Sequence, residues 1–255
     1  MLIVKPFNPV FCGMFLLCVV LAFLTGKAPR KVCKKIIILV NVIGAVWLLL
    51  YKNLLFLDPE YVEICLATKS EIPSVWTGLP FHFCNMLLFI TPFALWKENK
   101  RLLAFVCVSC IYSTGAALFM PSSGFSGYSL LLPRVLSYYC VHFAGLYSGF
   151  AILFSRLYEP DYKDILPTFG YTLLCYTIAF LVSFTLVKLH LSETVNYFYS
   201  MGPRNNAVLR FFYRLIPMPY FYFIPFITLF SVPTTLLTAL YRLGKKAVKK
   251  HSGRC

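Results

Sequence analysis

Long runs of apolar residues with few charges recur along the chain, and they leave few ways for it to fold. A helix needs about 20 mostly apolar residues to cross a bilayer, and several runs meet or approach that length. Only 13% of the residues are charged, whereas a soluble domain carries about 25%. The apolar residues also fill whole stretches instead of one stripe of a helix. The sequence therefore predicts an integral membrane protein with several spans.

We predict a single all-α membrane domain over residues 1–255 with about seven transmembrane helices. The predicted spans are residues 10–25, 36–57, 80–96, 102–120, 133–154, 165–189 and 218–241. The third is short for a bilayer and is the weakest as an independent span. The first could pass for a signal peptide, but no small-x-small cleavage site follows it, and more basic residues follow it than precede it. We therefore expect an uncleaved first helix.

The basic residues predict the orientation of these spans. Most of the 24 lysines and arginines lie in the connections that follow the first, third, fifth and seventh spans, including the clusters at 27–35 and 242–254. Short cytoplasmic connections of membrane proteins are enriched in lysine and arginine. We therefore expect the N-terminus outside and the C-terminus in the cytosol.

The net charge of +15 does not point to nucleic acid as a partner. The basic residues stand at the ends of apolar runs, as membrane topology requires, and no basic stripe is interleaved with exposed aromatic residues on a soluble module. We therefore expect membrane phospholipids as the partners and no nucleic acid. The sequence leaves protein partners unknown.

Ten cysteines are scattered along the chain, most of them inside apolar runs, where cysteine usually serves as a small packing residue. Cys107 and Cys110 have the spacing of a redox or zinc pair, but they fall inside a predicted span without a second pair. The sequence also has no glycine-rich phosphate loop and no clustered carboxylates. We expect neither a metal nor a cofactor.

The third span begins with polar residues. Pro80 suits the first position of a helix, so His82 and Cys84 fall in its first two turns, where the helix dipole favours a nucleophilic thiolate. Positions two apart are about 200° apart around a helix, so these side chains do not converge on one atom. This spacing disfavours a metal chelate and disfavours His82 as the base for Cys84. A base would come from another span.

The fifth span offers that base. Arg134, Tyr138 and His142 are four residues apart and share a helix face, which indicates a polar interior or cavity. His142 falls about 13 Å into the span, in the same predicted leaflet as Cys84. The two can therefore meet, and a histidine-activated cysteine can transfer acyl groups through a thioester. Two plainer interpretations stay open: a histidine that only bonds a neighbouring helix, and a cysteine that only packs.

The connection after the sixth span contains an amphipathic stretch, NAVLRFFYRL at 206–215. Arg210 and Arg214 are four residues apart within it, which predicts a short interfacial helix with arginines beside lipid phosphates. Ordinary snorkelling of these arginines is the alternative interpretation.

Three motifs together resemble the YwaF-like integral membrane proteins. They are LPFHFCN at 79–85, YYCVHFAGLY at 138–147 and VNYFYSMGP at 195–203, and the resemblance covers about residues 75 to 240. That family is similar to a eukaryotic transmembrane acyltransferase that remodels ether phospholipids. The resemblance implies that Cys84 and His142 are the acyl-transfer pair.

Other motif positions carry over in the same way. His82 matches the histidine of the first motif, and Asn196 and Tyr197 match the Asn-Tyr pair of the third. Asn85 stands where the bacterial pattern often has an acidic residue. An amide can orient a group but supplies no charge, which weakens a mechanism in which this neighbour holds an imidazolium.

The leading functional hypothesis is a membrane-embedded phospholipid acyltransferase, or a lipid hydrolase if water replaces the acceptor. Cys84 would be the nucleophile and His142 the base, supported by His82, Asn85 and Tyr138. The candidate substrate-binding residues are Arg134, Asn196, Tyr197, Arg210 and Arg214.

Two other classes of function stay open. A transporter or sensor would use Arg134, Tyr138 and His142 to line a path, although no internal repeat is visible. A non-catalytic partner of another membrane protein is the third possibility. The expected location is the cell membrane in a bacterium or internal membranes in a eukaryote.

Overall fold

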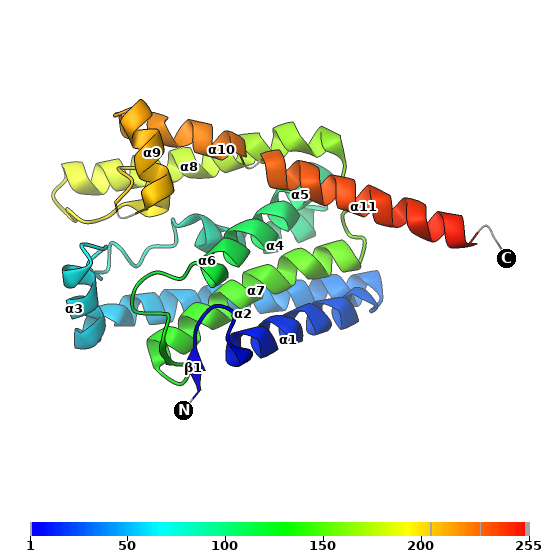
Figure 1. Ribbon diagram of the computed structural model, residues 1–255, viewed down its shortest axis with the longest axis horizontal. Coiled ribbons are helices and arrows are strands. Elements are labelled where there is room, and N and C mark those ends of the chain that lie inside the picture. The colour runs from blue at the N-terminus through cyan, green and yellow to red at the C-terminus, as the bar shows by residue number, and fades with distance from the viewer. Residues whose placement is uncertain (1, 205, 230, 253–255) are drawn as a thin grey trace.

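The computed structural model describes residues 2–204, 206–229 and 231–252, and nearly all of its regular structure is helical (Figure 1). Two short strands, β1 (Ile3–Val4) and β2 (Tyr128–Ser129), pair in antiparallel fashion. The helices are α1 (Pro9–Gly26), α2 (Arg30–Leu54), α3 (Pro59–Ala67), α4 (Phe83–Lys97), α5 (Lys100–Ser109), α6 (Gly115–Phe119), α7 (Pro133–Phe154), α8 (Ile165–Lys188), α9 (Ala207–Leu215), α10 (Ile224–Leu229) and α11 (Ser231–Ser252).

Six of the described helical segments are long and apolar enough to cross a membrane. They are Pro9–Gly26, Arg30–Leu57, Lys100–Phe119, Pro133–Phe154, Tyr162–Lys188 and Phe221–Lys245. The remaining predicted span corresponds to α4, which has only 15 residues. The protein is an all-α integral membrane protein with several passes, as predicted. The number of spans and their orientation stay predictions.

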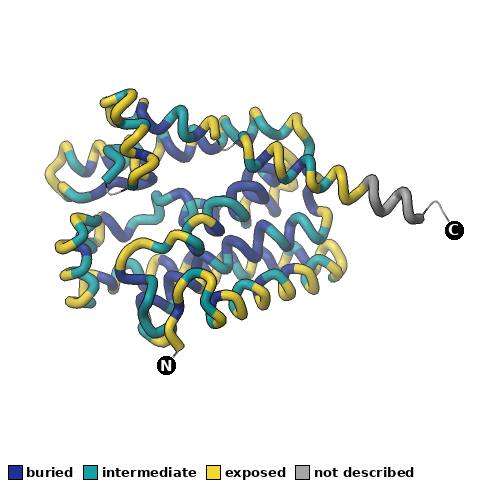
Figure 2. The backbone as a smooth tube through the Cα atoms, in the orientation of Figure 1, coloured by how far each residue is buried: buried dark blue, intermediate teal, exposed yellow. Residues whose placement is uncertain are grey.

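The surface of the helices explains why the chain needs a bilayer. Large apolar side chains such as Leu16, Leu24, Ile43 and Leu50 are exposed along α1 and α2. Figure 2 shows exposed residues around the periphery and buried residues along the central helices. Lipid chains can cover such a surface, whereas water would make it an aggregation hazard.

Helix α7 occupies the centre of the bundle and packs against α1, α2 and α4, while α5 packs against α8 (Figure 1). Two glycines of α7 allow its close approach to the wide π-helical turn Cys110–Thr114. A Cβ atom at Gly145 would lie 2.5 Å from Cγ2 of Thr114, and one at Gly149 would lie 2.7 Å from Cγ1 of Ile111. The absence of a Cβ atom at these two glycines therefore permits the short distance between α7 and the π-helical turn.

Contacts between the connections group them at two ends of the bundle. At one end, Lys34 near the start of α2 pairs with Glu98 after α4. At the opposite end, Arg134 at the start of α7 pairs with Asp58 ahead of α3 at 2.7 Å. Consecutive spans that cross the membrane in opposite directions would bring these connections together in this way. The basic residues after Lys245, which belong to the predicted cytosolic cluster at 242–254, lie outside the residues whose side chains the structure describes.

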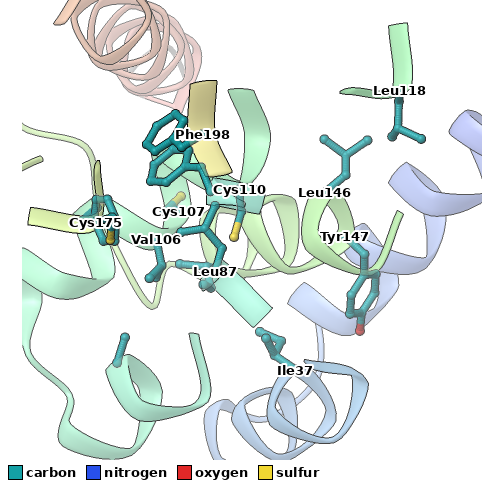
Figure 3. Close-up of a cluster of buried hydrophobic side chains, with 14 of the residues drawn as sticks. Ile37, Leu87, Val106, Cys107, Cys110, Leu118, Leu146, Tyr147, Cys175 and Phe198 are labelled. Carbon is teal, nitrogen blue, oxygen red and sulfur yellow. The ribbon is translucent and has the colours of Figure 1, made fainter. Parts of the chain in front are cut away.

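The apolar core around the beginning of α4 contains the Cys107–Cys110 pair. Figure 3 shows both thiols in a cluster with Leu87, Val106 and Phe198. No group of three metal-ligating side chains occurs anywhere in the described residues. The apolar surroundings of this pair therefore fit its interpretation as two small packing residues.

Candidate functional site

Helix α4 begins at Phe83, three residues later than the predicted span. Leu79–Phe81 form a turn in which the amide of Phe81 bonds the carbonyl of Leu79. His82 is then the N-cap, with extended backbone angles (φ −67°, ψ 141°), and its carbonyl accepts the amides of Asn85 and Met86. The first helical turn is therefore Phe83-Cys84-Asn85. It places the thiol at the amino-terminal end of the helix, as predicted.

The imidazole of His82 pairs with a carboxylate from the connection between α3 and α4. Nε2 of His82 lies 3.0 Å from Oε2 of Glu71. The other oxygen of Glu71 accepts the backbone N–H of Asn196 at 2.5 Å. Burial alone would raise the pKa of the Glu71 carboxyl, but His82, Lys52 and Arg204 hold it at about 2. Glu71 is therefore an anion that joins two separate motifs.

The turn after α8 is locked by the side chain of Asn196. Its Nδ2 donates to the carbonyl of Gly202 and its Oδ1 accepts the amide of Met201, both at 2.8 Å. The hydroxyl of Tyr197 donates to the carbonyl of Trp76. Asn196 and Tyr197 are both buried, so they fix this loop in place.

Aromatic rings join the same loop to α4. The ring of Tyr197 meets His82 edge to face at 5.2 Å between centroids. The next residue, Phe198, stacks on Phe83 at 4.6 Å. The first and third sequence motifs therefore meet in space, at the beginning of the helix that carries Cys84.

On α7, Nδ1 of His142 lies 2.7 Å from the carbonyl of Tyr138. A carbonyl only accepts, so Nδ1 carries the proton and the neutral ring has its lone pair on Nε2. The ring of Tyr138 covers His142 at 4.2 Å, and its hydroxyl donates to the carbonyl of Ala117 at 2.7 Å. His142 is therefore held in the tautomer that a general base requires.

Cys84 and His142 share an environment without touching. The thiol of Cys84 donates to Oδ1 of Asn85 at 3.6 Å, and no hydrogen bond joins it to His142 in the described part of the chain. Their helices pack together, and Lys52 of α2 lies within electrostatic reach of both. Tyr138, which covers His142, also interacts electrostatically with Cys84. Their direct approach stays a prediction.

Two cavities lie beside this cluster. The first, the Lys52 cavity, measures about 40 Å³, and Lys52, Tyr61, Glu71 and Thr77 are among its lining residues. The second, the Arg204 cavity, measures about 290 Å³, and its lining includes Lys69, Ser70, Glu193, Thr194 and Arg204.

Residues 70–73 contribute alternately to the two cavities. Ser70 and Ile72 line the Arg204 cavity, whereas Glu71 and Pro73 line the Lys52 cavity.

A family model described as the TMEM164 family matches residues 6–239. The chain belongs to the TMEM164 family. No curated protein and no solved structure matches it. The match includes α1 to α10 and part of α11, so every residue of the site lies within the region that represents the TMEM164 family. The resemblance to YwaF-like proteins and to a lipid acyltransferase stays a prediction.

In this TMEM164 family member, the predicted arginines differ in their surroundings. The guanidinium of Arg134 is buried and binds Asp58 at 2.7 Å, Glu60 at 2.8 Å and the carbonyl of Gly124 at 3.2 Å. All of its nitrogens are therefore engaged by protein, which argues against a role in holding substrate. Arg210 and Arg214 are exposed on α9, and this helix confirms the predicted amphipathic segment.

Sequence reasoning missed two charged residues of this TMEM164 site, Lys52 and Glu71. Lys52 counted only toward the charge balance of an outer connection, and Glu71 lies eleven residues before His82 in an irregular segment. Neither position has a spacing that links it to the motifs. A usable signal was the absence of an acidic residue at Asn85, since a partner for the motif histidine then had to come from elsewhere.

Proposed function

We propose that the protein is a membrane-embedded phospholipid acyltransferase that works through a thioester on Cys84. The observation that supports this most is the shared environment of Cys84 and His142, which have Lys52 and Tyr138 as common neighbours. The tautomer of His142 adds support, because the lone pair on Nε2 can accept a proton.

In the first half-reaction, Nε2 of His142 takes the proton of the Cys84 thiol, and the sulfur adds to the ester carbonyl of the donor lipid. The tetrahedral intermediate collapses with cleavage of the ester C–O bond. The leaving alkoxide takes the proton from His142, which gives a lysolipid and an acyl thioester.

In the second half-reaction, His142 removes the proton of an acceptor lysolipid hydroxyl, whose oxygen attacks the thioester carbonyl. The C–S bond breaks, and the thiolate recovers its proton from His142. Water in place of the lysolipid gives a free fatty acid, so the same groups also support a lipase reaction. The first-turn position of Cys84 favours both reactions, because helix amino termini stabilise developing negative charge.

The transporter or sensor hypothesis has less support from the contacts. It needs Arg134, Tyr138 and His142 to present polar groups to a path. The guanidinium of Arg134 is held by two carboxylates and a carbonyl, and the hydroxyl of Tyr138 is bonded to Ala117. We therefore do not propose transport.

The test is acyl labelling of Cys84. Purified protein is incubated with a phospholipid that carries a radiolabelled acyl chain, and the hydroxylamine-labile label on the protein is measured. We expect a labelled wild type, no label on Cys84→Ala, and about 100-fold slower labelling of His142→Gln, the usual effect of losing a general base. Cys140→Ala is the matched control, because this thiol is exposed on α7. Equal labelling of Cys84→Ala and wild type would refute the covalent mechanism.

A further inference from the structure

Lys52 is a half-buried positive charge in the interior of the site. It lies in the last turn of α2, and its ammonium forms no hydrogen bond or ion pair within the described part of the chain. A charge that is removed from water is unfavourable unless polar partners or an opposite charge surround it. The position of Lys52 therefore suits an anionic ligand.

The nearby carboxylate of Glu71 does not neutralise this lysine by direct pairing. Although Glu71 interacts electrostatically with Lys52, its two oxygens are bound by His82 and by the backbone of Asn196. Arg204 adds further positive charge around the same carboxylate. Lys52 and Arg204 are therefore two positive groups within electrostatic reach of this one carboxylate.

The location of Lys52 indicates which anion it would bind. It lines a cavity with Tyr61, and it lies within electrostatic reach of Cys84 and His142. In a phospholipid only a few bonds separate the phosphate from the ester carbonyls. A phosphate held at this lysine would leave an ester within reach of the thiol.

We propose that Lys52 binds the phosphate group of the phospholipid whose ester Cys84 attacks. This inference rests on the proposed function. It assigns the binding of the substrate phosphate to a lysine that lies outside the three sequence motifs. An ammonium is a compact point charge that binds phosphate well. Lys52 takes the role that the sequence suggested for Arg134, whose donors are engaged by Asp58 and Glu60.

The experiment measures binding without turnover. Full-length protein with Cys84→Ala is stripped of lipid in a sugar-based detergent. Its affinities for dioleoylphosphatidylcholine and for dioleoylglycerol, which lacks the phosphate, are compared by native mass spectrometry. We expect the phospholipid to bind about tenfold or more tightly, the usual contribution of a hydrogen bond to a charged group.

Variants on the same background assign the effect to Lys52. We expect Lys52→Gln to abolish the preference for phospholipid and Lys52→Arg to retain it. Lys69→Gln is the matched control, because this exposed lysine between α3 and α4 lines the Arg204 cavity instead of the Lys52 cavity. No preference in the Cys84→Ala parent, or an unchanged preference in Lys52→Gln, would overturn the proposal.

A second arm separates the two sources of phosphate. Inorganic phosphate alone is titrated, and thermal stabilisation is recorded. Lys52-dependent stabilisation by the free ion, without a preference for phospholipid, would overturn the lipid assignment. Because Cys84 is absent, the binding result is independent of the acyl-labelling test. A Lys52-dependent preference without a thioester would keep the phosphate site and refute the covalent chemistry alone.

Discussion

The carboxylate of Glu71 joins the connection between α3 and α4 to the N-cap of α4 and to the turn after α8 through its bonds to His82 and Asn196. The motif residues themselves were recognisable from the sequence, because an ionisable histidine is unusual at the beginning of an apolar run. Glu71, the partner of His82, was not recognisable from the sequence. A contact between an irregular loop and a helix cap follows no period that a sequence displays.

Replacing Glu71 by glutamine should lower stability at neutral pH by about 2 kcal/mol, since a buried hydrogen bond to a charged group is lost. Folding lowers the pKa of Glu71 from 4.5 to about 2. Its contribution is therefore complete above pH 4.5 and disappears as the pH falls toward 2.

The measurement is the thermal unfolding midpoint in detergent between pH 7 and pH 3. Wild type should lose stability more steeply than Glu71→Gln below pH 4.5. Glu63→Gln, which changes an exposed carboxylate of α3, should follow wild type. Parallel pH curves for wild type and Glu71→Gln would show that the ion pair is absent.

At the level of the elements, apolar run length predicted the helices well, because crossing a bilayer imposes a minimum length. All seven expected spans correspond to helical segments, including the short α4. The start of α4 was less predictable. Pro80 suggested the first turn, yet the chain turns through Leu79–Phe81 and places its cap at His82, so local hydrogen bonding prevailed over proline preference.

The approach of α7 to the π-helical turn gives a prediction at this scale. Gly145→Ala should destabilise the protein by about 1–3 kcal/mol, the usual penalty for overpacking a core. The new Cβ would overlap Cγ2 of Thr114, whose hydroxyl is already bonded to the carbonyl of Cys110. Gly13→Ala on α1 meets no atom within 4 Å and should be neutral or slightly stabilising.

Rescue distinguishes this overlap from a general effect of alanine. Thr114→Ser removes Cγ2 and keeps the hydroxyl, so it should restore most of the thermal midpoint lost in Gly145→Ala. If the double variant is as unstable as the sum of the two single variants, the close approach of α7 is not the cause.

At the level of the whole molecule, the ion pairs group the connections at two ends, while the lipid-facing surface is made of exposed leucine, isoleucine and valine. Composition was sufficient to predict this architecture, because a charge-poor chain of this kind has no stable alternative in water. The direction of insertion depends on charges outside the apolar runs and is a separate prediction.

Orientation can be tested with reporters at the C-terminus. A fluorescent protein that matures only in the cytosol should be bright when fused after residue 255, and alkaline phosphatase at the same position should be inactive. The reverse pattern would place the clusters at 27–35 and 242–254 outside and would put Cys84 in the inner leaflet.

Residues 70–73 line both cavities, so one short segment connects the two. Ser70 and Ile72 line the Arg204 cavity, while Glu71 between them lines the Lys52 cavity. A molecule that displaced this segment from the Arg204 cavity would also displace the Glu71 carboxylate, which binds His82 and Asn196. Binding in the Arg204 cavity and the geometry at the first turn of α4 would then depend on each other.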